Sequence, residues 1–250
     1  MINTPASIVA HLPNTLILWD VDHTLIENGG VSKETYALAF ELLTGRAPSV
    51  RPDTDGRTDF EIMHELLSAN SVDTEKYVEI GQFEDALVEA MERNVSQLPQ
   101  RGHILPGAIT ALTVLSIIPT VVQSVLTGNI ASNARVKLRT FGLDKLVDLN
   151  VGGFGSDDTI RSNLVNTARR KTLKKYGMTF DRSSTILIGD TPLDIKAARD
   201  GGAKMIAVAT GVYSTSQLLE AGADVTLDSL ADFDRFMAAL VELRTGVTSV

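Results

Sequence analysis

The sequence predicts an α/β protein with a doubly wound, mostly parallel sheet and an inserted helical block. Short apolar runs alternate with segments of helical period, which is typical of strands joined by crossover helices. The first run, residues 15–20, is apolar up to two carboxylates, Asp20 and Asp22. Residues 32–97 then show only helical patterns, which is too long for an ordinary connection. This block therefore reads as an insertion between the first two strands of the sheet.

The expected elements follow one another regularly along the chain. A leader over residues 1–14, with one helical turn at about 8–12, precedes the first strand. Apolar runs predict strands at residues 15–20, 121–127, 147–151, 184–190, 205–209 and 225–227. Helical periods predict helices at residues 32–43, 59–67, 74–95, 107–116, 131–141, 160–176, 192–200, 216–221 and 231–243. Thr191, Pro192 and Gly201 fit the two ends of the helix at 192–200, because proline favours a first turn and glycine an end.

Composition limits the classes of function. Hydrophobic residues make up 44% and charged residues 22% of the 250 positions, as in an ordinary globular chain. The net charge of −8 argues against binding to nucleic acid or to an anionic membrane. The absence of cysteine excludes disulfides and thiolate metal sites. We find no signal peptide and no apolar run long enough to span a membrane, so we expect a cytoplasmic protein.

Polar side chains follow four of the predicted strands. Asp20 and Asp22 follow the first, and Thr127, Gly128 and Asn129 end the second. The loop after the third strand leads to Arg161, and Asp190 ends the fourth, with Asp194 four residues on. Because the carboxyl ends of parallel strands lie at one edge of a sheet, these groups are expected to converge there.

A convergence of carboxylates, a hydroxyl and a cation suits phosphoryl transfer. Oxygen ligands of this kind favour Mg²⁺. One carboxylate can act as a nucleophile and another as a general acid and base. A hydroxyl, backbone N–H groups and a fixed cation can bind the transferring group.

Three segments resemble the motifs of the haloacid dehalogenase superfamily. The segment 20–25, Asp-Val-Asp-His-Thr-Leu, is similar to its first motif, and 126–129, Leu-Thr-Gly-Asn, to its second. The segment 188–194, Ile-Gly-Asp-Thr-Pro-Leu-Asp, resembles the fourth. The helical block, with Gly-Arg-Thr-Asp at 56–59, resembles the cap of the phosphoglycolate-phosphatase-like branch. The resemblance implies a Rossmann-like core over residues 1–30 and 99–250 and a cap over 31–98.

The resemblance also implies roles for individual residues. Asp20 would be the nucleophile and a metal ligand. Asp22 would be the acid and base, its backbone carbonyl a further ligand of Mg²⁺. Asp190 and Asp194 would complete the metal site. Phosphoryl oxygens would be bound by Thr127, Gly128 and Asn129, and Arg57 would reach over the site from the cap.

The third motif of the family, a lysine followed by proline, is missing from this chain. Arg161 stands about where it belongs, at the start of the helix predicted before the fourth-motif strand, and is our prediction for that cation. The alternative cations are Lys171, Lys174 and Lys175, deeper in the same helix, where a solvated face explains them better.

Two site residues also have purely structural explanations. Asp194 lies three positions after Thr191, where a carboxylate can complete a capping box. Asn129 can cap the helix predicted at 131–141. The first explanation is compatible with a role in metal binding, and the second competes with a role in phosphate binding.

The function predicted from the sequence is a Mg²⁺-dependent phosphatase of a small phosphorylated metabolite, with a phosphoglycolate-like substrate as the family's example. A phosphomutase acting on a sugar phosphate and a non-catalytic phosphate-sensing module are the alternatives. We expect a monomer or a homodimer.

Overall fold

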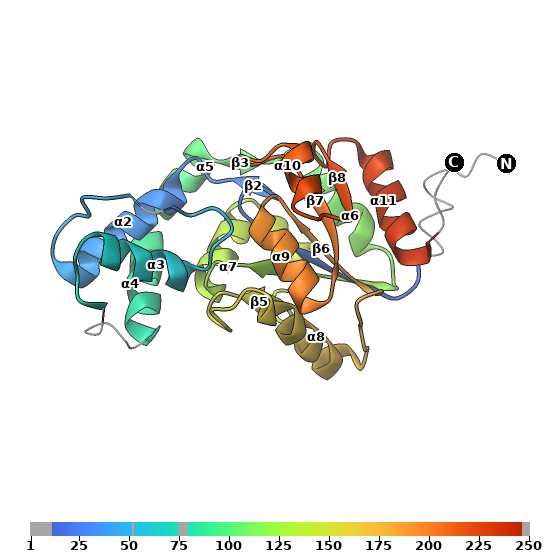
Figure 1. Cartoon of the computed structure of the whole chain (residues 1–250), viewed down its shortest axis with the longest axis horizontal. Coiled ribbons are helices and arrows are strands. Elements are labelled where there is room, and N and C mark those ends of the chain that lie inside the picture. Colours follow the sequence, from blue (N-terminus) through green and yellow to red (C-terminus); the bar gives the residue numbers. More distant parts are fainter. Residues whose placement is uncertain (1–11, 52, 75–79, 247–250) are drawn as a thin grey trace.

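The computed structural model describes residues 12–51, 53–74 and 80–246, so most of the predicted leader lies outside it. Six strands form one sheet in the order β5-β4-β1-β6-β7-β8 (Figure 1). Every neighbouring pair in this sheet is parallel, which confirms the predicted α/β class. The strands are β1 (Thr15–Trp19), β4 (Val121–Thr127), β5 (Gly153–Phe154), β6 (Thr185–Gly189), β7 (Lys204–Val208) and β8 (Val225–Leu227).

Helices cover both faces of the sheet, because its central strand is apolar on both sides. Ile17 and Trp19 of β1 pack into one apolar cluster, and Leu16 and Leu18 into another. The first cluster includes side chains of α6 (Ala108–Ser116), α7 (Ala131–Thr140) and α11 (Phe233–Thr245). The second includes side chains of α8 (Asn163–Tyr176), α9 (Pro192–Gly201) and α10 (Thr215–Glu220). None of the described helices is long and apolar enough to cross a membrane.

The position of β1 decides where the polar strand ends meet. It lies between β4 and β6, with Trp19 level with Val125 on one side and Ile188 on the other. Asp20 therefore leaves the sheet between the ends of its two neighbours. The chain continues outward to β5 on one side and to β7 and β8 on the other, so the order of strands reverses here. Ligands of open α/β sheets bind at such a point.

The helical block has an apolar core of its own. Its helices are α2 (Val31–Thr44), α3 (Asp59–Ala69) and α4 (Ile80–Asn94), and they share a cluster that includes Phe40, Met63 and Leu87. In Figure 1 these helices stand at one end of the molecule, beside the sheet. A 3₁₀ turn, Val95–Gln97, and the short helix α5 (Leu98–Arg101) lead back to the core. The domain boundaries at 30/31 and 98/99 stay a prediction.

Two local expectations were wrong, and two short strands were not predicted. Residues 147–151 form turns, and the edge strand is β5, two residues later. Val147, Leu149 and Val151 are buried and alternate like a strand, but the backbone N–H of Asp148 bonds to Gln123 without forming a ladder. The helix predicted from residue 160 begins at Asn163. The sequence also gave no sign of β2 (Ile26–Glu27) and β3 (His103–Ile104), which pair antiparallel where the chain enters and leaves the block. One or two helices were predicted over 74–95; residues 75–79 lie outside the described residues, and α4 begins at Ile80.

A close backbone contact joins the block to the sheet edge. The Asp59 N–H donates to the carbonyl of Gly128 at 2.8 Å. A Cβ at Gly128 would lie 2.0 Å from the carbonyl oxygen of Arg57, so only glycine fits between the two segments.

We predict that Gly128→Ala destabilises the protein by ~2 kcal/mol, because the added methyl group has to push these backbones apart. The urea midpoint measures the loss. Gly81→Ala is the matched control, since a Cβ there meets open space, and its midpoint should be unchanged or raised. Equal midpoints for the two variants would contradict the prediction.

Candidate active site

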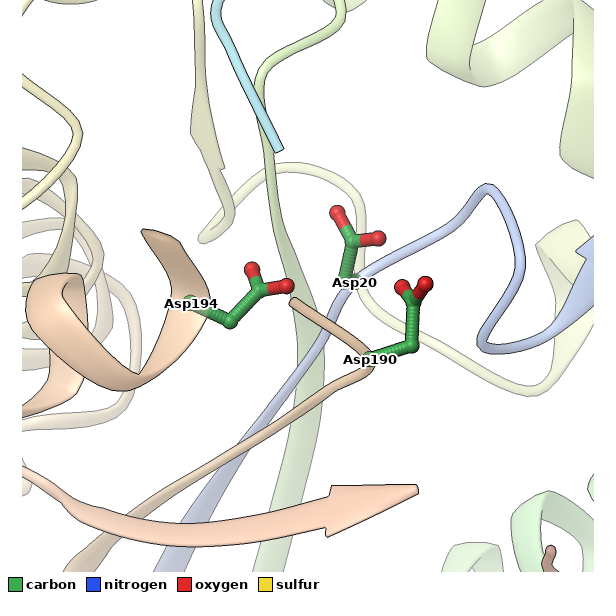
Figure 2. Close-up of side chains that lie close together, drawn as sticks. All are labelled: Asp20, Asp190 and Asp194. Atoms are coloured by element: carbon green, nitrogen blue, oxygen red, sulfur yellow. The ribbon is translucent and has the colours of Figure 1, made fainter. Parts of the chain in front are cut away.

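Three buried carboxylates meet at the carboxyl edge of the sheet. Asp20 follows β1, Asp190 follows β6 and Asp194 lies in the first turn of α9. Each offers an oxygen atom within 4.8 Å of the other two, and their exposed fractions are 6%, 2% and 0%. Figure 2 shows the three side chains gathered from these separate elements around one space. The convergence predicted for these residues is therefore present.

Asp194 is fixed by the capping box that the sequence suggested. The N–H and hydroxyl of Thr191 both donate to Asp194 Oδ2, and the Asp194 N–H donates back to the hydroxyl. Gly189 leaves room for this carboxylate, because a Cβ there would lie 2.4 Å from Asp194 Cγ. The capping box uses Asp194 Oδ2 and leaves Oδ1 directed at the site. Helix capping and metal binding are therefore compatible roles for this carboxylate.

Arg161 faces the cluster from the turn before α8. Its Nη2 donates to Asp20 Oδ1 at 2.8 Å and to Asp194 Oδ1 at 2.5 Å. Its Nη1 donates to the carbonyl of Gly56, in the loop that precedes α3, at 3.0 Å. The guanidinium thus links two carboxylates of the core to the helical block.

The alternative lysines lie elsewhere. Lys171 pairs with Asp157, Lys175 pairs with Asp148, and Lys174 is exposed. Of the four candidates, the structure places Arg161 alone against Asp20.

Crowding of like charges dominates the electrostatics of the cluster. Burial and the neighbouring Asp194 carboxylate raise the pKa of Asp20 to about 7, although Arg161 opposes the change. Burial, Asp194 and Asp20 also raise the pKa of Asp190 well above its usual value. One guanidinium does not balance three carboxylates, and a divalent cation among them would favour their charged forms. The donor set therefore fits a hard cation such as Mg²⁺.

Asp22 is turned away from the cluster and is held by three side chains. Asn28 donates to its Oδ1 at 2.8 Å, and Asn129 and Lys137 donate to its Oδ2 at 2.8 and 2.6 Å. Burial by itself would raise the pKa of Asp22. The Lys137 ammonium and the three hydrogen bonds outweigh that effect and lower the pKa to about 2. Asp22 is thus a carboxylate in this arrangement, and its side chain is not among the three gathered ligands.

Lys137 was missed by the sequence analysis. It is 1% exposed, and its Nζ also donates to Asn129 Oδ1 at 2.6 Å. A signal was available, because Ala134, Lys137, Leu138 and Phe141 follow the i, i+3, i+4, i+7 pattern of the buried face of α7. A cation inside an apolar stripe indicates a buried anion opposite it.

The second-motif residues line the same cavity as Asp20. Thr127 is 1% exposed, and its hydroxyl accepts from Asn129 Nδ2 at 2.8 Å. The capping explanation for Asn129 was wrong, because the N-cap of α7 is Ile130 and has no side-chain cap. The Asn129 side chain is occupied by the contacts to Asp22, Thr127 and Lys137. Gly128 contributes its backbone next to the loop that holds Arg57.

Arg57 also lines the cavity, as expected for a cap residue, but acidic side chains surround it. Its guanidinium pairs with Glu65 and lies 3.6 Å from Asp53. These pairs reduce the positive charge that it offers to a ligand.

A buried polar contact holds the block against the sheet edge. Tyr36 of α2 donates its hydroxyl to Asp59 Oδ1 at 2.6 Å, and the Ile130 N–H donates to Asp59 Oδ2 at 2.8 Å. Burial raises the pKa of Asp59, although Lys137 and these hydrogen bonds favour its charged form. Asp59 belongs to the segment 56–59 that resembles a motif of the cap. Its bonds to Tyr36 and Ile130, which join three separate elements, were not predicted from the sequence.

The comparisons with known proteins agree with this geometry. Residues 163–233 match a family model described as HAD-hydrolase-like. Over these residues the chain is similar to the haloacid dehalogenase-like hydrolases. It is 24% identical over 237 residues to "Probable phosphatase IndB" from Dickeya dadantii. The alignment covers 94% of this chain and 98% of that protein. The resemblance to this superfamily that the three motifs predicted is thereby confirmed.

Solved structures share this haloacid dehalogenase-like fold. A hydrolase from Pseudomonas syringae aligns with a TM-score of 0.63 at 19% identity, covering 89% of this chain and 96% of that one. A predicted phosphatase from Clostridium acetobutylicum aligns with a TM-score of 0.65 at 15% identity, covering 92% and 99%. A candidate beta-phosphoglucomutase from Bacteroides vulgatus aligns with a TM-score of 0.64 at 19% identity, covering 94% and 91%.

We predict that Lys137→Met lowers the free energy of unfolding by ~3 kcal/mol, because it leaves the Asp22 charge buried without its cation. Adding Asp22→Asn to this variant should recover part of the loss, since the uncompensated charge is then removed. Urea unfolding of the single and double variants measures both effects. A double variant less stable than Lys137→Met would contradict the pairing.

Proposed function

We propose that this chain is a Mg²⁺-dependent phosphatase that hydrolyses a small phosphomonoester through an aspartyl-phosphate on Asp20. The observation that carries the proposal is the buried cluster of Asp20, Asp190 and Asp194 with Arg161 bonded to it, beside the hydroxyl of Thr127. These residues would supply an attacking carboxylate, metal ligands and a cation at one edge of the sheet.

In the first half of the proposed reaction, an Asp20 carboxylate oxygen attacks phosphorus and the bond to the leaving oxygen breaks. Arg161 and the Thr127 hydroxyl face the same cavity and would bind phosphoryl oxygens. Asp20, Asp190 and Asp194 would hold Mg²⁺, with the Asp22 carbonyl as a further ligand. When bound, the cation supplies positive charge that offsets the charge of the phosphoryl group.

In the second half, water attacks the phosphorus of the aspartyl-phosphate and returns Asp20 as a carboxylate. Asp22 is proposed as the base that takes the proton from this water. Lys137, Asn28 and Asn129 favour the ionised carboxyl, which is the form that can accept a proton. To act as the acid toward the leaving oxygen, the Asp22 side chain has to turn away from Lys137 and take up a proton.

A phosphomutase is the second candidate, because the neighbouring structures include the candidate beta-phosphoglucomutase. Its reaction would return the phosphoryl group to a second oxygen of the substrate instead of to water. Product analysis separates the two functions, since a mutase isomerises a hexose phosphate and a phosphatase releases inorganic phosphate.

We predict that Asp20→Asn lowers the release of phosphate from a panel of phosphomonoesters on the order of 10³-fold, because the amide is a poor nucleophile. Acid quenching followed by mass measurement should show a phosphorylated peptide containing Asp20 in the wild-type protein alone. Asp200→Asn, exposed at the end of α9, is the control and should keep wild-type turnover. Turnover that survives in Asp20→Asn would disprove the assignment, and an inactive wild-type protein across the panel would favour the phosphate-sensing alternative.

Removal of metal should stop turnover. We predict that EDTA abolishes phosphate release, that Mg²⁺ restores it, and that Mg²⁺ raises the Tm of the wild-type protein by binding the folded state. Asp190→Asn should lose the shift in Tm, because a ligand is missing and the remaining carboxylates repel each other less. Full turnover after exhaustive chelation would count against the proposed metal site.

A further inference from the structure

Ser32 carries a buried hydroxyl group without a partner beside the proposed site. It is the second residue of α2, its exposed fraction is 8%, and it lines the cavity that contains Asp20 and Thr127. Within the part of the chain that the structure describes, Ser32 Oγ makes no hydrogen bond. Burying a hydroxyl in this way is unfavourable unless a ligand forms the missing hydrogen bond.

Ser32 does not bond to the carbonyl four residues earlier, which is the usual partner of a serine or threonine hydroxyl inside a helix. Thr35, one turn further along α2, donates its hydroxyl to the carbonyl of Val31 at 2.8 Å. The corresponding carbonyl for Ser32 is that of Asn28, which accepts the N–H of Val31 instead. Asn28 Oδ1 lies 3.5 Å from the Ser32 N–H, so the backbone has a neighbour while the hydroxyl has none.

The charges around the cavity disfavour a second anionic group on the ligand. Among the described residues, the basic side chains that line it are Arg57, Arg161 and His23. Arg57 pairs with Glu65, Arg161 with Asp20 and Asp194, and His23 with Glu27. A carboxylate on the leaving group would thus find no unpaired cation to compensate the loss of its hydration.

A cationic group on the ligand would also find few anions to pair with. The two Asp22 oxygens already accept from Asn28, Asn129 and Lys137, and those of Asp59 accept from Tyr36 and Ile130. Asp55, the other carboxylate on the cap side, is partly exposed. An ammonium group would thus meet a free carboxylate only at the partly exposed Asp55, whereas an uncharged hydroxyl needs only the Ser32 dipole.

The cavity is small. Its volume is about 50 Å³, and one water molecule takes up roughly 10–15 Å³ on the same measure. A cavity of this volume suits a phosphoryl group together with a short chain better than a nucleoside or a second sugar ring.

We propose that the leaving group is a short, uncharged alcohol with a second hydroxyl, which Ser32 Oγ binds, so that the substrates are monophosphates of small diols or triols. This inference rests on the proposed phosphatase function and replaces its phosphoglycolate-like example with a neutral substrate class. Ser32 would set specificity and would take no part in the transfer of the phosphoryl group.

Four phosphomonoesters of almost equal size test the proposal with the intact protein and Mg²⁺. They are ethyl phosphate, 2-hydroxyethyl phosphate, phosphoglycolate and phosphoethanolamine, which end in a methyl, hydroxyl, carboxylate and ammonium group. We expect kcat/KM for 2-hydroxyethyl phosphate to exceed that for each of the other three by roughly tenfold, the value of one well-placed hydrogen bond. If phosphoglycolate or phosphoethanolamine had the highest kcat/KM, or if all four values were equal, the proposal would be overturned while the phosphatase function stands. Absence of turnover with all four would overturn both.

Ser32→Ala separates recognition from folding. It should lower kcat/KM for 2-hydroxyethyl phosphate about tenfold and leave ethyl phosphate within about twofold, because only the former uses the hydroxyl. The urea midpoint should not fall, since the variant removes a buried group without a partner. Ser68→Ala, exposed on α3, is the control and should change neither substrate. An equal loss on both substrates, or a lower midpoint with no change in specificity, would show that Ser32 is structural.

Discussion

The site depends on the burial of three like charges with a single guanidinium bonded to two of them. Asp20, Asp190 and Asp194 come from two strand ends and one helix, and Arg161 bonds to Asp20 and Asp194. Carboxylates placed so closely repel one another, which explains the raised pKa values of Asp20 and Asp190. The packing of the sheet and of α9 must hold them together, and that stored repulsion favours a divalent cation.

The two first-motif carboxylates are paired with different groups. Two residues apart in the sequence, Asp20 and Asp22 have opposite environments: a cluster of anions for one, and a buried ammonium with two amides for the other. Their pKa values therefore move in opposite directions. Divergent environments of this kind are how one fold supplies both a nucleophile and a proton carrier.

The helical block contributes contacts that complete the site. Asp59 bonds to Tyr36 and to the backbone of Ile130, and Gly56 accepts from Arg161. The bonds of Asp59 to Ile130 and of Gly56 to Arg161 join the block to residues at the sheet edge. The position of the block is thus coupled to the charged cluster, which gives its residues, Ser32 among them, a fixed place around the cavity.

The sequence by itself determined the fold class and the residues at the strand ends. Apolar periodicity indicates which residues are buried, and the three motifs can be recognised in the sequence without knowledge of contacts. Only the tertiary structure decided what those residues bond to. Lys137 and Tyr36 bond to residues of other elements, and Ser32 lines a cavity built from segments distant in the chain. Neither periodicity nor a motif specifies which side chain meets which. The same reason explains the misplaced edge strand: alternation at 147–151 reports burial, but a strand requires a ladder of backbone bonds to a neighbour.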